Sequence, residues 1–316
     1  MTIKYFAVSL VAVLTACAST PKSSPNGGSG GSVGSGGSTG SGGTSGSGGN
    51  SASGGSGSGG SGSGGKALGA DCINSPDDLI ADFKTDNGVY NIDGREGGFY
   101  TYGDDSEKTD PPQAVLNPPE GGAGTIDSST GNDECSGPGS FHVTATGFAI
   151  WGAALGTNLA PMDGSNKGWY DASKYKGISF WAKAGKPLTG VQVSFPDVYT
   201  DGGANPAEAD PNATMCSYGS SLYNCSPFLV KFGDPGFPNY MDFQIDTTWK
   251  RFDIMFADTQ QDSNNKPGRL LTAPDHIDLS HLTAMAIQVN ALHDDATMTV
   301  IANDFDIWVD DVNFIR

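Results

Sequence analysis

Short runs of alternating apolar and polar residues recur along the C-terminal three-quarters of the chain. In "GVQVSFP", for example, single polar residues separate Val191, Val193 and Phe195. This period of two predicts half-buried β-strands, and no long segment repeats apolar residues at the helical spacing i, i+3, i+4 and i+7. We expect ten short strands, over residues 79–83, 98–102, 139–148, 149–157, 177–184, 190–197, 227–232, 249–256, 283–291 and 304–315. Separated by Gly, Pro and Asn turns, they predict an all-β fold, an antiparallel β-sandwich.

Three long irregular segments interrupt these strands, at residues 103–138, 198–226 and 257–281. Loops of this length in a compact domain usually carry function or need cross-links that hold them in place. We therefore expect binding or stabilising features in these segments.

The alternation also sorts side chains into two faces. One face is aliphatic, as with Ile178, Ile287 and Val289, and belongs to the core. The other face carries neutral polar groups and an indole, namely Trp181, Gln192, Ser194, Gln288 and Asn290. Amides can hydrogen-bond to sugar hydroxyl groups and an aromatic ring can stack on a pyranose, so this composition is typical of a carbohydrate-binding surface. The alternative is a sheet face covered by one of the long loops, with its amides satisfied internally.

We expect a polysaccharide chain to lie along a concave sheet, with Trp181 as the stacking platform and the four polar residues as hydrogen-bond partners. Trp151 and Tyr199 adjoin glycine-rich or acidic loop entries, which places them at the rim of this surface.

The first residues of the chain have the features of an export signal. Residues 1–17 hold one Lys near the start, then an apolar run that ends at Cys17 and is too short to span a bilayer. Small residues precede the cysteine, as in a bacterial lipoprotein signal. We expect lipidation of Cys17, which would anchor the chain in the bacterial cell envelope, at the outer membrane or cell surface. The alternative is an ordinary secretory signal in which the cysteine has no role.

Residues 18–65 follow, and the stretch from Pro25 to Gly65 is almost only Gly and Ser, with no acidic or basic residue. Such a segment cannot bury enough apolar surface to offset its ordering entropy, which predicts a disordered tether. The remaining residues, 66–316, are enough for one large β domain. They contain all 35 acidic residues and 15 of the 17 Lys and Arg, a net charge of 15 − 35 = −20. This charge excludes recruitment to nucleic acid or anionic lipid by electrostatics, and we expect a monomer whose only membrane contact is the lipid anchor.

Four cysteines follow Cys17. An even number in an exported domain favours two disulfides, for which three pairings are possible. We favour Cys216–Cys225, which closes a short loop, and Cys72–Cys135, which attaches the domain start to a glycine-rich insertion. A zinc site is disfavoured because no C-x-x-C spacing is present and the four histidines are scattered.

Several segments together resemble a known family. "YDASKYKGISFWAKAG", "VQVSFPDVYTD", "DTTWKRFDIMFADT" and "FDIWVDDVNFI" are similar, in that order, to galactose-binding-like β-jelly-roll carbohydrate-binding modules, with the family 11 modules as the nearest relatives. The resemblance covers residues 170–316 well and 72–160 more weakly. It implies a jelly-roll sandwich that binds β-glucans or similar polysaccharides. Many such modules are attached to glycoside hydrolases, and a domain of about 250 residues leaves no room for a catalytic domain beside it.

The resemblance also implies one structural calcium ion, held by an acid of the first strand and an acid of the last. Asp82 and Asp310 match those places. Calcium would explain the adjacent carboxylates Asp310 and Asp311, because a divalent cation replaces their repulsion by shared coordination. Strand alternation places the two on opposite sides, one binding the ion and the other capped by solvent or a turn amide. The alternative is an edge-strand acid that deters pairing between sheets.

The sequence favours non-catalytic carbohydrate binding over enzymatic activity. A glycosidase needs two carboxylates at a set distance across a cleft, and among 35 acids pairs such as Asp104 and Glu107 carry no information. No nucleophile triad, zinc helix or phosphate loop is recognisable outside the tether. The alternatives are a glycoside hydrolase or other polysaccharide-active enzyme, and a structural or protein-binding surface domain with the same fold.

Overall fold

The computed structural model describes residues 72, 75–84, 88–109, 113–122, 125–127, 131, 135, 137–217, 225–233, 240–261, 275–294, 297 and 299–316. The expected signal over residues 1–17, including Cys17, and the expected tether over 18–65 lie outside these residues. Within the described residues, no helix is long and apolar enough to cross a membrane.

The described residues form an antiparallel β-sandwich of the jelly-roll type. The first sheet has the strand order β13 (Lys250–Met255), β9 (Gly177–Ala184), β18 (Phe305–Ile315), β5 (Phe141–Thr146) and β3 (Val115–Asn117). Two more strands, β1 (Leu79–Ala81) and β4 (Thr125–Ile126), pair with β18 and β5 respectively. All pairings in this sheet are antiparallel.

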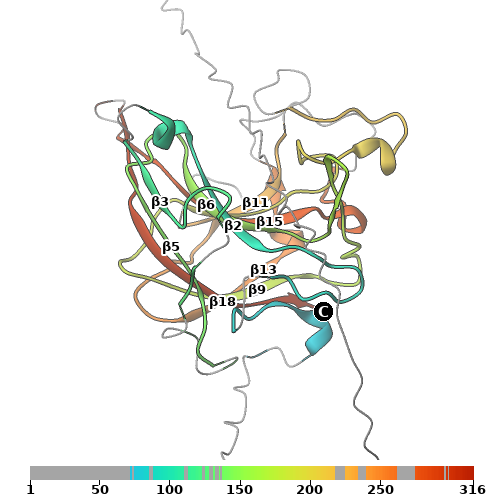
Figure 1. The fold of residues 1–316 in the computed structure, drawn as a ribbon, viewed down its shortest axis with the longest axis horizontal. Coiled ribbons are helices and arrows are strands. Elements are labelled where there is room, and N and C mark those ends of the chain that lie inside the picture. The colour runs from blue at the N-terminus through green and yellow to red at the C-terminus, as the bar shows by residue number, and fades with distance from the viewer. Residues whose placement is uncertain are drawn as a thin grey trace, which may run out of the picture. The chain divides into compact units, whose positions relative to one another are not determined.

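The second sheet has the strand order β12 (Tyr240–Met241), β11 (Phe228–Phe232), β10 (Val191–Phe195), β15 (Ala284–Asn290), β6 (Gly152–Asn158) and β2 (Phe99–Gly103). A further strand, β14 (Gln260–Gln261), also pairs with β11. Only the β11–β12 pairing is parallel. Figure 1 shows the two sheets as separate layers, with β5, β18 and β9 in one and β6, β2, β15 and β11 in the other.

Smaller elements connect these strands. Two hairpins are β7 (Met162–Asp163) with β8 (Asn166–Lys167), and β16 (Leu292–Asp294) with β17 (Thr299–Ile301). The short 3₁₀ helices are η1 (Pro76–Asp78), η2 (Asp105–Lys108), η3 (Pro206–Glu208), η4 (Phe256–Asp258) and η6 (Leu279–His281).

Aromatic contacts join the two sheets in one hydrophobic core. Phe99 of β2 and Phe141 of β5 have ring centroids 5.7 Å apart, and Phe232 of β11 lies 5.5 Å from Phe252 of β13. Burial of each such side chain stabilises the fold by about 1.5–3 kcal/mol. The alternating apolar residues thus point inward from both layers, which leaves two outward faces for other roles.

All ten strands expected from the alternation are present, with ends within three residues of the predicted ones. The shorter strands were missed, because two or three residues are too few for alternation to register. Two of them, β3 and β4, lie in the 103–138 segment that was expected to be irregular throughout.

Both expected disulfides are confirmed. Cys72 is bonded to Cys135, and Cys216 to Cys225. The second bond closes a short loop within the long segment 198–226, as the spacing suggested.

The acidic pair Asp310–Asp311 lies in the middle of a central strand, so the interpretation as an edge-strand acid is wrong. β18 pairs with β9 on one side, and with β5 and β1 on the other. Its register with β9 shifts between Asp310 and Asn313, and Asp311 has a φ of 47°, a left-handed conformation that aspartate tolerates. Both residues are consequently buried, so of the two expected caps the solvent cap is wrong, while an amide hydrogen bond is present, from Asp311 N–H to Asp310 Oδ1 at 2.8 Å.

Candidate functional site

The outward face of the second sheet presents a row of residues across six strands. Residues directly opposite each other in paired strands point to the same face. The strand registers place them in the order Tyr102, Ala154, Gln288, Gln192, Lys231 and Tyr240. Five inter-strand spacings make this row about 24 Å long. We call this outward face, centred on Gln192, Gln288 and Asn290, the amide face.

The three amides of this face are hydrogen-bonded to one another. Gln288 Nε2 donates to Asn290 Oδ1 at 2.6 Å, and Asn290 Nδ2 donates to Gln192 Oε1 at 3.3 Å. This chain fixes the orientation of each amide. It leaves Gln192 Nε2 as a donor and Gln288 Oε1 as an acceptor, neither of which bonds another described residue. Expected ligand residues Gln192, Gln288 and Asn290 are therefore brought together, all half-buried.

Small residues form the floor beside the amides. Ala154 is fully buried and Ala286 is 7% exposed, although both point outward. Gly156 lies in the next row, where an added Cβ would come 2.8 Å from the Met285 carbonyl oxygen. Protein atoms therefore already cover these small residues, and a ligand on this face would contact the half-buried amides and tyrosines instead.

Three aromatic residues line the β2 side of the amide face, and we call them the aromatic edge: Tyr100, Tyr102 and Trp151. The ring centroids of Tyr100 and Tyr102 are 5.8 Å apart, and those of Tyr102 and Trp151 are 6.0 Å apart. Tyr100 donates its hydroxyl to Asn158 Oδ1 at 3.4 Å. Burial raises the pKa of Tyr100, so its phenol is neutral.

Tyr100 and Tyr102 were not expected from the sequence to be ligand residues. The pattern was available, since they alternate with Phe99 and Thr101 along the expected strand 98–102, and in the structure Phe99 and Thr101 are the buried pair. What the sequence could not give is that β2 lies next to β6, which brings these tyrosines to the same face as the amides.

Trp181 does not belong to this face, so its expected role as a platform beside the amides is wrong. It lies in β9 of the first sheet, whereas the amides lie in β10 and β15 of the second. The outward faces of two packed sheets point in opposite directions. Alternation reports the side of a strand, not the sheet to which the strand belongs.

The remaining expected ligand residues, Ser194, Trp151 and Tyr199, lie at three different places on the second sheet. Ser194 points outward on β10 opposite Ala286, and is 7% exposed. Trp151 directly precedes β6, near the Asn290 end of β15, and Tyr199 follows β10 near the Ala284 end. The two expected rim residues therefore flank opposite ends of the strands, and the ring of Trp151 contacts that of Tyr102.

The outward face of the first sheet is less suited to stacking. Trp308 is stacked on His142 of β5 at 4.2 Å, and Lys183 Nζ of β9 lies 4.8 Å from the Trp308 ring centroid on the other side. The indole N–H of Trp308 donates to Asp127 at 3.1 Å. His142 and Lys183 of this protein therefore already contact the Trp308 ring.

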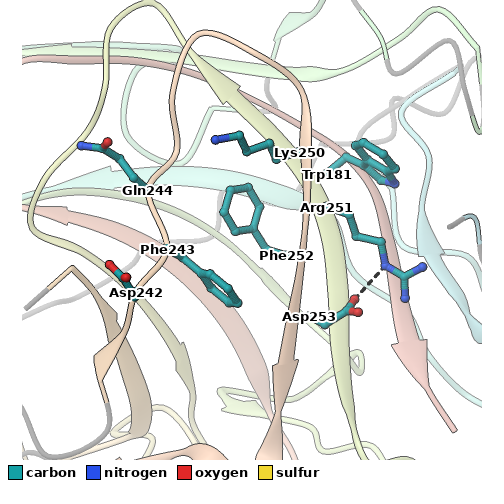
Figure 2. Close-up of a pocket in the computed structure, with 8 residues that line it drawn as sticks. All are labelled: Trp181, Asp242, Phe243, Gln244, Lys250, Arg251, Phe252 and Asp253. Atoms are coloured by element: carbon teal, nitrogen blue, oxygen red, sulfur yellow. Dashed lines mark hydrogen bonds and ion pairs between the residues drawn. The ribbon is translucent and has the colours of Figure 1, made fainter.

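A hollow of about 580 Å³ lies beside β13, at the edge of the first sheet (Figure 2). Its lining consists of Trp181, Asp242, Phe243, Gln244, Lys250, Arg251, Phe252 and Asp253. Trp181 and Phe252 are buried, which leaves Phe243 as the aromatic ring with an exposed surface, 37%. Figure 2 also shows the ion pair that joins Arg251 Nε and Asp253 at 2.7 Å. Charged pairs rather than amides dominate this hollow, so the amide face is the better candidate site.

One carboxyl pair is electrostatically unusual. Burial, followed by the hydrogen bond and charge of Glu120, raises the pKa of Glu107 to about 7. Glu107 is therefore partly protonated at neutral pH.

The expected calcium ligands come from adjacent strands. Asp82 directly follows β1, which pairs with β18 at Ala81 and Val312, and Asp310 lies in β18. Asp82 accepts a hydrogen bond from Tyr90 at 3.0 Å, and Asp310 accepts one from the Asp311 amide at 2.8 Å. Among the described residues, no group of three or more His, Cys, Asp or Glu side chains could hold a metal ion. A calcium ion here would depend on backbone carbonyls to complete its six to eight oxygen ligands.

Comparison with known proteins gave matches only at the level of structure. No protein-family model and no curated protein matched the chain. It is similar to the family 11 carbohydrate-binding module of the cellulosomal cellulase Lic26A-Cel5E of Clostridium thermocellum, with 15% identity, a TM-score of 0.38, and coverage of 75% of this chain and 92% of that chain.

Two further solved structures are similar to the same extent. A family 11 module from Clostridium thermocellum, in complex with a β-1,3-1,4-mixed-linked tetrasaccharide, has 14% identity, a TM-score of 0.39, and coverage of 75% and 94%. The family 30 module of the cellulosomal cellulase Cel9D-Cel44B of that organism has 14% identity, a TM-score of 0.37, and coverage of 75% and 95%. The resemblance to family 11 modules expected from the sequence is found again in the structure.

Proposed function

We propose that this chain binds a polysaccharide on the amide face without cleaving it. The observation that carries the proposal is the row from Tyr102 to Tyr240, in which two glutamine amides lie between aromatic residues. Amides provide paired donors and acceptors for sugar hydroxyl groups, and the aromatic edge provides a surface for stacking. This combination binds a neutral, hydroxyl-rich ligand.

The ligand lies across the strands rather than along one of them. The row is about 24 Å long, which is more than one sugar ring can cover. Affinity is therefore expected to rise with the length of an oligosaccharide until the row is filled. Single contacts of this kind are weak, and a dissociation constant between micromolar and millimolar corresponds to about −8 to −4 kcal/mol.

A glycan array with a Cys17→Ser form of the chain tests the proposal. The panel should include β-glucans, the ligand class suggested by the sequence resemblance, together with other plant and microbial polysaccharides. Ligands that bind should then be titrated calorimetrically against the wild-type site and Tyr102→Ala. We expect weaker binding by Tyr102→Ala, and absence of binding to every glycan would contradict the proposal.

The same samples test the enzyme alternative. Prolonged incubation of a bound polysaccharide with the chain should release no new reducing ends. Release of reducing ends that stops in Glu107→Gln would instead assign catalysis to the Glu107–Glu120 pair.

We further propose that Cys17 carries a lipid anchor and that residues 18–65 hold the binding domain away from the membrane. The apolar run ending at Cys17 and the Gly/Ser composition support this arrangement. Cys17→Ser should move the chain from the membrane fraction to the soluble fraction. Retention in washed membranes would argue against the anchor.

A further inference from the structure

Asp104 directly follows β2 and is 1% exposed. Its Oδ2 accepts hydrogen bonds from three successive backbone amides, those of Ile150 at 2.8 Å, Trp151 at 2.9 Å and Gly152 at 3.0 Å. Its Oδ1 accepts a fourth from the Ser106 amide at 2.9 Å. Successive N–H groups that converge on one anion form a nest, which fixes the backbone around that anion.

The carboxylate in this nest is ionised at neutral pH. Burial raises the pKa of Asp104, but hydrogen bonds from Ser106, Gly152 and Ile150 outweigh this effect, and the pKa lies below its usual value. All four N–H bonds are therefore charge-assisted, and such bonds are about twice as strong as neutral ones. Loss of the charge would weaken the whole turn that precedes β6.

Trp151 is also held from its carbonyl side. Its carbonyl oxygen accepts a hydrogen bond from the Ala291 amide at 3.1 Å. Its ring lies 6.0 Å from that of Tyr102, centroid to centroid. With its N–H bonded to Asp104, Trp151 has both backbone polar groups fixed, and its ring completes the aromatic edge.

We propose that Asp104 is a positioning residue that holds Trp151 ready for stacking on a sugar ring. The inference rests on the proposed function of the amide face. Asp104 is buried and saturated with backbone donors, so its effect on the ligand passes through Trp151. A platform fixed before binding lowers the ordering cost of association, which raises affinity without a new contact.

A double-mutant cycle between Asp104→Asn and Trp151→Ala tests this role. An Asn side chain keeps the shape but has one acceptor oxygen and no charge, so it cannot serve both Ser106 and the nest. We expect Asp104→Asn to weaken glycan binding about tenfold, or about 1.4 kcal/mol. The double variant should bind no more weakly than Trp151→Ala alone, because the two residues act as a unit. Additive losses would overturn the proposal.

Asp105→Asn is the matched control. Asp105 is the neighbouring acid, partly exposed and paired with Lys108 at 3.0 Å, and among the described residues it does not bond to Ile150, Trp151 or Gly152. This variant should bind glycan as the wild type does. An equal loss of glycan affinity in Asp105→Asn and Asp104→Asn would mean that removal of either negative charge has the same effect. This result would contradict a specific role for the hydrogen bonds to Asp104.

Ser106→Ala provides a milder variant if Asp104→Asn does not fold. Ser106 Oγ accepts from the Ala149 amide at 3.3 Å, at the start of the turn that Asp104 holds. We expect Ser106→Ala to bind glycan about threefold more weakly than the wild type. When Trp151 is already replaced by Ala, Ser106→Ala should cause no further loss of affinity. An unchanged affinity in Ser106→Ala would count against the turn as a determinant of binding.

Fluorine NMR separates this inference from the proposed function. With 5-fluorotryptophan incorporated at all five tryptophans, Trp151→Phe assigns the Trp151 resonance. Ser106→Ala and Asp104→Asn should shift or broaden this resonance and leave the other four unchanged, whether or not a glycan has been found. If wild type binds no glycan, the proposed function fails and the NMR result still decides the positioning role. An unmoved Trp151 resonance, or equal changes in all five, would overturn it.

Discussion

Gln192 lies directly opposite Gln288 where β10 pairs with β15, and both bond to Asn290. Replacement of Gln288 by Ala removes one side-chain amide and leaves the side-chain oxygen of Asn290, Oδ1, without its donor. The amides of Asn290 and Gln192 then lose their fixed orientation. We expect about tenfold weaker glycan binding, or about 1.4 kcal/mol, by calorimetry. The melting temperature should change little, because the side chain is half-buried and its bond is a neutral one. Gln244→Ala, an exposed amide in the hollow beside β13, is the matched control and should bind normally. Weaker binding by Gln244→Ala together with normal binding by Gln288→Ala would instead place the ligand site in that hollow.

Trp181→Ala should act on stability rather than on binding. Trp181 is 8% exposed and lies in the first sheet, away from the amide face. Truncation of a buried Trp costs about 3–5 kcal/mol, which lowers the melting temperature of a domain of this size by roughly 6–20 °C. Trp169→Ala, at a residue that is 38% exposed, should lower it much less. Lost binding by a Trp181→Ala sample that is fully folded would reinstate Trp181 as a ligand residue.

Removal of the Cys216–Cys225 disulfide should destabilise the domain modestly. The bond spans a sequence separation of nine residues, for which loop entropy predicts about 2–3 kcal/mol. Denaturant unfolding of the Cys216→Ser/Cys225→Ser double variant measures this difference. A loss close to zero would mean that the segment is equally restricted without the bond.

Calcium is expected to stabilise the fold through Asp82 and Asp310. If calcium binds only the folded state, stability rises by about 2.7 kcal/mol when free calcium is a hundredfold above its dissociation constant. Chelation should then lower the melting temperature of the wild type and leave that of Asp310→Asn unchanged. Identical melting of the wild type with calcium and with chelator would exclude the site. The bulge in β18 and the hydrogen bond from the Asp311 amide to Asp310 would then hold the buried pair without a metal ion.

Glu107 should make stability depend on pH in the window between about 4.5 and 7. Its pKa is raised from 4.5 to about 7 in the folded state, first by burial and then by Glu120. The protonated form is therefore favoured by folding: its contribution is fully present below pH 4.5 and is lost as the pH rises through about 7. Because the side chain is half-exposed, solvent screening reduces this contribution to the order of 1 kcal/mol, or about 2–4 °C in melting temperature.

Thermal melts of the wild type and Glu107→Gln between pH 4 and 8 measure this effect. The glutamine variant keeps a hydrogen-bond donor toward Glu120 and does not titrate, so its melting temperature should fall less across the window. Glu208→Gln, at an exposed glutamate of η3, should follow the wild type. Parallel curves for the wild type and Glu107→Gln would assign the pH dependence to other groups.

Much of the fold and part of the candidate site were predictable from the sequence alone. Alternation located ten strands and the side of each strand that points outward, which identified Gln192, Gln288 and Asn290. Cysteine spacing led to the correct disulfides. The alternation and the nine-residue separation of Cys216 and Cys225 are local features, which neighbouring residues carry, whereas Cys72 and Cys135 are 63 residues apart.

Tertiary structure decided which outward residues share a face. Trp181 and Gln288 have the same local pattern, yet β9 joins the first sheet and β15 the second. Likewise β2 pairs with β6, and this distant pairing brings Tyr102 beside the amides and Asp104 under the turn that carries Trp151. The bulge that buries both Asp310 and Asp311 is also set by pairing with β9. Strand order depends on how the apolar faces of distant strands pack together. Many orders of the same alternating strands would bury these faces equally well within each strand pair. The choice of one order is therefore made only when the whole chain folds.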